Sequence, residues 1–138
     1  MIVVVIMGVL AALAIPNYAR VRERASIARA IGDIRALGMD LTDYQMDHGS
    51  FPSSLASIGR AGLLDPWGQP YHYVRVTGSN KGALRKDRFL VPINSDFDLY
   101  SMGPDGQTNK PLQNAKSRDD IIRANDGAFI GKASTYDP

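Results

Sequence analysis

Hydrophobic residues are spread unevenly along the chain, and their spacing changes near residue 16. Residues 1–15 contain no charged or polar side chain. Because apolar residues surround this stretch on all sides, the pattern predicts a helix that is buried all round. The apolar positions that follow are three or four residues apart, which is typical of a helix with one buried face. These positions are Ile27, Ile31, Ile34, Gly38 and Leu41, with Leu37 and Tyr44 beside them.

The two patterns join into one long predicted helix. We expect it to end near His48-Gly49, because glycine is the usual cap at a helix C-terminus. The chain then divides into an apolar segment (1–16), an amphipathic segment (17–48) and a globular head (49–138).

The apolar segment has three interpretations. At about 1.5 Å per residue it spans about 22 Å, which is less than the roughly 30 Å of a bilayer core. It resembles a signal peptide in length, but no basic segment precedes it. A helix buried in a protein core is the second interpretation, although Pro16 interrupts its hydrogen bonding. We favour the third, a membrane span truncated at its start, and expect further residues upstream of Met1.

The head contains three predicted strands. Residues 71–76 and 97–101 alternate between two faces, and residues 88–91 are predicted as a short strand whose edge or end is marked by Pro92. Three short antiparallel strands packed on one long helix make an α+β fold with a small sheet. Trp67 lies within a predicted turn (65–68), and we expect it to pack between helix and sheet.

Charge and composition exclude several functions. The chain has 138 residues, a net charge of +2 and no cysteine, which excludes disulfides and cysteine-based metal sites. The two histidines, His48 and His72, lie in no catalytic or phosphate-binding motif, so we expect no enzyme activity. The helix carries four Arg and one Glu in residues 17–30 but four Asp and one Arg in residues 31–48. Without interleaved aromatic residues, these arginines do not predict nucleic-acid binding.

Two groups of motifs carry a family resemblance. Gly8, Ala11-Ala12 and Ile15-Pro16-Asn17-Tyr18 lie within and after the apolar run. This arrangement resembles the N-terminal segment of type IV pilins and of type II secretion pseudopilins. In the head, LDPWGQPY (64–71), DLYSMGPDG (98–106) and DDI (119–121) resemble segments of the major pseudopilins, in the same order. The chain departs from the family pattern at residues 77–95 and 106–118, and residues 123–127 replace the short family ending.

The resemblance implies a structural subunit of a homopolymeric helical filament. The subunit would be inserted in the bacterial inner membrane with its head in the periplasm, and would then join a periplasmic or extracellular filament. Expected partners are minor pseudopilins or pilins and an assembly platform. Leader cleavage and N-methylation are implied by the family alone. The predicted filament-core and membrane residues are Ile2, Val3, Val4, Val5, Ile6, Gly8, Val9, Leu10, Leu13, Ile15 and Pro16.

Several points within this interpretation stay open. The filament is either a pseudopilus that supports type II secretion or a type IV surface fibre, and a monomeric membrane-anchored binding module is the alternative of a different class. We expect the helix to loosen near Pro16 in the filament. The opposite charges of the two helix halves predict staggered pairing between copies. The residues predicted to pair are Arg20, Arg22 and Arg24 with Asp40 and Asp43.

Acidic residues near the last predicted strand suggest a structural calcium site. Calcium takes about six to eight oxygen ligands from carboxylates and loop carbonyls. From the residues alone, Asp105 as a turn former and Asp119-Asp120 as the cap of a short helix remain the alternative. The resemblance adds that major pseudopilins bind calcium with matching acids. It implies Asp105 and Asp120 as ligands, helped by Asp119 and the carbonyl of Met102.

Overall fold

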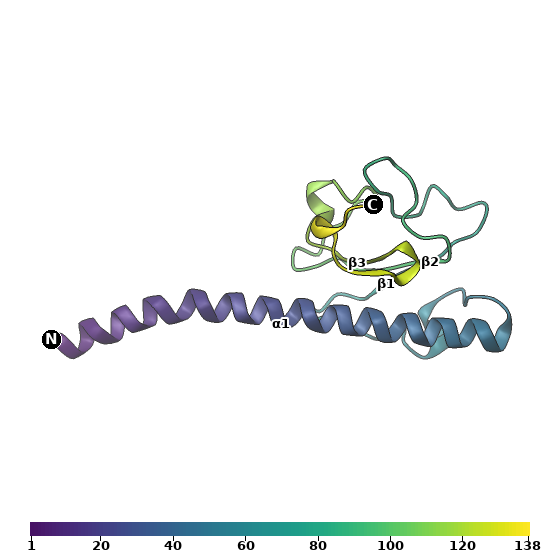
Figure 1. Cartoon of the computed structure of the whole chain (residues 1–138). Helices are drawn as coiled ribbons and strands as arrows, with labels where there is room; N and C mark the ends of the chain where they lie inside the picture. Colours follow the sequence, from purple (N-terminus) through teal and green to yellow (C-terminus); the bar gives the residue numbers. More distant parts are fainter.

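One long helix and one small sheet organise the chain. The structure, a computed structural model, describes the backbone of residues 1–138 and all side chains except those of Ala14 and Pro16. Within this description, α1 (Ile2–His48) has 47 residues and the sheet has four strands. Figure 1 shows α1 as a gently curved rod whose C-terminal half carries the head, while its N-terminal half extends beyond it. The predicted α+β class is confirmed.

The helix ends at the predicted glycine. Gly49 adopts a left-handed conformation with φ 76°, and its N–H donates to the carbonyl of Gln45 at 2.8 Å. The ring of His48 stacks on Tyr44, with 4.0 Å between the ring centroids. α1 is continuous through position 16 in the single chain. The predicted loosening at Pro16 concerns assembled subunits, and the side chain of Pro16 lies outside the described residues.

The strands are antiparallel and follow one another in chain order. They are β1 (His72–Arg75), β2 (Phe97–Ser101), β3 (Ile121–Ala124) and β4 (Phe129–Lys132), in the order β1-β2-β3-β4. The register places Tyr73 opposite Leu99 and Tyr100 opposite Ile122. Two of the three predicted strands are therefore confirmed, as β1 and β2.

The predicted strand at residues 88–91 is wrong, because this segment forms a tight turn. The Oδ1 atom of Asp87 accepts from the N–H of Phe89 at 2.8 Å and from the N–H of Val91 at 2.9 Å. An aspartate that binds the backbone two residues on favours a turn over a sheet ladder. Leu90 takes a φ of 62° within this turn, which no strand residue adopts.

The sheet lies between two apolar layers. On one face, Phe97, Leu99 and Ile121 pack against Ile34 and Leu37 of α1. Trp67 is half-buried against this same core, which agrees with its predicted position. The opposite face carries a second cluster beneath the loops, formed by Ile93, Leu112, Ile122, Ala124 and Ala133.

Candidate functional site

The N-terminal third of α1 is an apolar surface without a cover. Among its described side chains, Ile2 is 77% exposed and Ile15 is 69% exposed. The predicted filament-core residues from Ile2 to Ile15 all lie on this stretch, which we call the apolar arm (residues 2–15). By length and composition, α1 is the one described helix able to cross a membrane. An uncovered apolar surface of this extent is typical of a segment that contacts lipid or protein.

The head holds only the second part of α1. Ala30, Ile34, Leu37 and Leu41 are each at most 1% exposed, and they point into the helix–sheet core. The hydroxyl of Tyr71 donates to Asp33 Oδ2 at 2.8 Å and ties the segment before β1 to the helix. The arm is therefore free because the packing residues of α1 begin only near residue 27.

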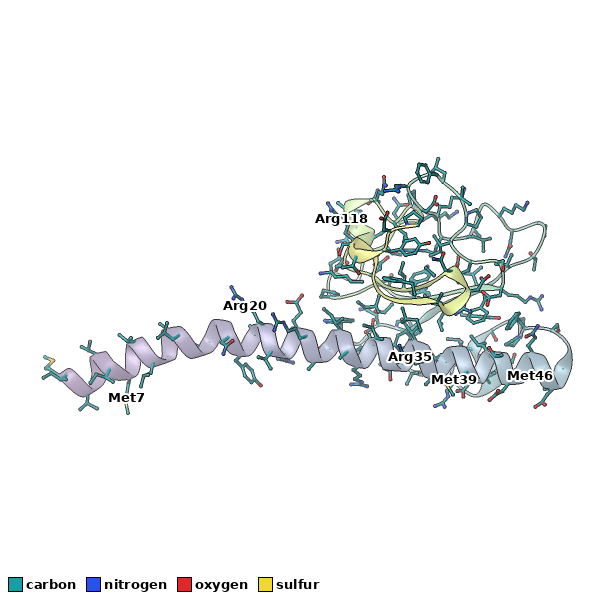
Figure 2. The ribbon with its side chains drawn as sticks, in the orientation of Figure 1. Met7, Arg20, Arg35, Met39, Met46 and Arg118 are labelled. Carbon is teal, nitrogen blue, oxygen red and sulfur yellow. The ribbon has the colours of Figure 1, made fainter. Side chains whose placement is uncertain are left out.

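The predicted charge-pairing residues lie on different parts of α1. Arg20, Arg22 and Arg24 are exposed on the stretch between arm and head, where Figure 2 labels Arg20. Asp40 Oδ2 lies 2.9 Å from Arg60 Nε of the same chain, a contact that the helical pattern did not indicate. Asp43 is exposed. Of the two acids, Asp43 is thus better placed to meet another copy.

The structure brings Asp105 and Asp119 together at the rim of the head. The N–H of Asp105 lies 3.3 Å from Asp119 Oδ2. Gly103 has a φ of 67°, and a Cβ atom at this position would lie only 2.5 Å from the carbonyl oxygen of Asp119. The glycine therefore permits the close approach of the two loops. Met102, whose carbonyl was predicted as a ligand, is half-buried in the same turn.

Asp120 lies apart from this rim, in a fully buried position. Its Oδ2 atom is 2.5 Å from Arg85 Nη2 and accepts from the Thr108 hydroxyl at 2.6 Å. Burial raises the pKa of Asp120 to about 6, although the hydrogen bond from Thr108 and the charge of Arg85 act in the opposite direction. The Arg85 guanidinium also lies 4.4 Å above the Tyr100 ring. No motif in the sequence pointed to Arg85.

These residues do not fit a calcium ion that uses Asp120 as a ligand. Among the described residues there is no group of three His, Cys, Asp or Glu side chains placed to hold a metal. Asp105 Oδ1 accepts from the N–H of Gln107. In the part of the chain that the structure describes, Oδ1 of Asp120 is buried without a hydrogen-bond partner, as are Nε of Arg85 and Nε2 of His72. A calcium ion beside that oxygen would lie close to the Arg85 cation, which would repel it.

The chain shows clear similarity to known secretion proteins, although no family model matches it. It is 32% identical over 128 residues to the type II secretion system core protein G of Pseudomonas aeruginosa, covering 78% of this chain and 80% of that protein. The corresponding protein of Escherichia coli K12 is 31% identical, covering 78% of each chain. This chain belongs to the type IV pilin-like pseudopilins. A fimbrial protein of Neisseria meningitidis is also similar, with 28% identity over 91% of this chain and 75% of that protein.

In this pseudopilin, two of the three head motifs that carried the resemblance contact each other directly. Asp65 opens the turn of the first motif (64–71), and its Oδ1 accepts from the N–H groups of Trp67 at 3.0 Å and Gln69 at 2.9 Å. Its Oδ2 accepts from the hydroxyl of Ser101, at the end of β2, at 2.5 Å. The second motif therefore fixes the turn of the first, and the turn places Trp67 on the core.

Proposed function

We propose that this pseudopilin is a non-enzymatic structural subunit of a homopolymeric pseudopilus that supports type II secretion. The uncovered apolar arm is the observation that supports this proposal. Before assembly the arm lies in the bacterial inner membrane with the head in the periplasm. During assembly, arms from neighbouring copies pack together and replace contacts with lipid. Minor pseudopilins and an assembly platform are the partners, and the filament is periplasmic or extracellular.

The arm gives a direct test of this proposal. Leu10 is 61% exposed and belongs to the apolar arm, which extends away from the head (Figure 1). Leu10→Arg places a cation where lipid or other arms are apolar, at a cost of roughly 3 kcal/mol in a bilayer centre. We expect this variant to lose sedimentable filaments and secretion, while the head keeps its melting temperature. Leu10→Ile is the matched control and retains both. Filaments of normal length from Leu10→Arg would contradict the proposal.

The similarity to a fimbrial protein supports a second candidate, the pilin of a surface fibre. Deletion of the protein separates the two candidates. Loss of secretion with surface fibres intact supports the pseudopilus, and loss of fibres with secretion intact supports the pilin. A chain that stays membrane-bound and monomeric in cross-linking and sedimentation would favour an anchored binding module instead.

A further inference from the structure

Two long segments without strands cover the face of the sheet that points away from α1. Residues 76–96 connect β1 to β2, and residues 102–120 connect β2 to β3. Their backbones meet at Lys86, whose N–H donates to the carbonyl of Lys110 and whose carbonyl accepts from the N–H of Leu112, both at 3.0 Å. Long connections of this kind need specific contacts to hold one conformation.

Arg85 supplies contacts to both segments and to the sheet. It is only 3% exposed, and its backbone N–H donates to Asp98 Oδ2 of β2 at 2.6 Å. Its guanidinium binds Asp120 at the end of the second segment and the Thr108 hydroxyl in its middle. The same group covers the ring of Tyr100 on β2. One side chain therefore joins two long connections to the central strand.

We infer that the Arg85 guanidinium holds the Asp120 carboxylate in place of the calcium ion that the family resemblance assigns to it, so that the loop layer over the sheet keeps its fold without calcium at Asp120. A calcium ion and the Arg85 guanidinium can each neutralise a carboxylate and hold oxygen atoms from different loops close together. Arg85 is covalently part of the chain and keeps its proton at all accessible pH values. A calcium ion next to this guanidinium would add repulsion between two cations in a buried site.

The positions of these residues in the sequence support the inference. Arg85 lies in residues 77–95 and Thr108 lies in residues 106–118. These are two of the stretches in which the chain does not match the family resemblance, so the cation and its hydroxyl partner both come from unmatched segments. The inference concerns the head alone and holds whether or not the chain forms filaments.

Thermal unfolding of the full chain in detergent micelles tests this inference. The chain has a single tryptophan, and Trp67 packs on the head core, so its fluorescence reports the head rather than α1. We expect the same midpoint in millimolar calcium and in excess chelator, and no heat when calcium is titrated into the chelator-treated protein. A midpoint that rises with calcium would overturn the inference.

Substitution of the arginine gives an independent test. Arg85→Gln leaves a buried carboxylate without its cation, and we expect the midpoint to fall by roughly 10 °C. Arg88→Gln is the control, because Arg88 binds Asp137 at 3.2 Å with both side chains largely exposed, and we expect a fall of roughly 3 °C or less. Equal midpoints for the two variants would refute the role of Arg85. If Arg85→Gln does not fold, the calcium comparison on the unaltered chain still decides.

Discussion

At the scale of single residues, Asp126 fixes the tight connection between β3 and β4. Its carboxylate accepts from the backbone N–H of Ser95 at 2.7 Å and from the Ser95 hydroxyl at 2.6 Å. Asp126 and its neighbour Asn125 both have positive φ values, 52° and 51°. Asparagine and aspartate tolerate this conformation better than other residues with a side chain. The connection between β3 and β4 therefore depends on asparagine and aspartate at two left-handed positions and on the contacts that Ser95 makes from the β1–β2 connection.

The same contacts predict a pH dependence. Partial burial alone would raise the pKa of Asp126, but the hydrogen bonds from Ser95 and Asp96 together outweigh burial, and the pKa lies below its ordinary value. The stabilising contribution is thus present above the unfolded pKa of about 3.9 and is lost as pH falls through the lower folded pKa. We expect Ser95→Ala to raise the pKa of Asp126, as measured by carboxyl NMR titration.

Ser134→Ala is the control for this titration, because Ser134 is exposed and contacts other parts of the head through its backbone. The difference in unfolding free energy between wild type and Ser95→Ala should shrink as the solution is acidified below the unfolded pKa. An unchanged Asp126 pKa in Ser95→Ala would show that the hydroxyl contributes nothing.

At the scale of elements, the turn at residues 87–91 holds a leucine in an unfavourable conformation. Leu90 has a φ of 62° and is 62% exposed, so it has the strain of a left-handed residue without burying its side chain. A left-handed conformation costs a residue with a Cβ atom about 1–2 kcal/mol. Glycine avoids this cost, but it raises the conformational entropy of the unfolded chain, which offsets part of the gain. We expect Leu90→Gly to raise the unfolding free energy by about 0.5–1 kcal/mol.

Two further variants check this explanation by chemical denaturation. Leu90→Ala keeps the strain and should not gain stability. Val91→Gly removes a side chain at a position without positive φ, and we expect it to lose stability. If Leu90→Gly is less stable than wild type, the leucine side chain makes a contribution that its exposure does not indicate.

The sheet shows which elements a hydrophobic pattern can predict. β1 and β2 alternate in the sequence, and both were predicted. In β3 all four residues, including Arg123, are buried, because α1 covers one face and the loop layer covers the other. A strand buried on both faces has no alternation to detect. The acids before β3 instead suggested a helix cap, although Asp120 is fully buried against Arg85.

At the scale of the whole molecule, the sequence predicts the division into arm and head but not the contacts within the head. The arm follows from a local property, the absence of polar residues over one stretch. The Arg85 contacts join residues 85, 98, 100, 108 and 120, which come together only after the sheet has formed. No rule of sequence spacing links residues that are brought together only by the fold. The sequence therefore indicated Asp120 as a candidate site residue but did not indicate Arg85 as its partner.

The same limit applies to the proposed surface between copies, because the structure shows that one of the two predicted acidic residues already has a partner within the chain. Asp40 is bound to Arg60 within the chain, so it is a weaker partner for another copy than the exposed Asp43. We expect Arg24→Glu to raise the critical concentration for filament assembly roughly 5- to 10-fold, because it replaces an attraction between copies with a repulsion of about 1 kcal/mol. The added reversal Asp43→Arg should restore assembly, and Asp40→Arg should not.

Sedimentation of purified chains at low ionic strength measures these changes, and added salt should reduce the difference between wild type and Arg24→Glu, because exposed charges are screened. Arg118→Glu is the matched control, since Arg118 lies on the side of the head away from α1 (Figure 2) and carries the same change of charge. If Arg24→Glu assembles normally, Arg24 does not pair with Asp43 of another copy in the filament. Rescue by Asp40→Arg rather than Asp43→Arg would mean that the Asp40–Arg60 contact opens when copies meet.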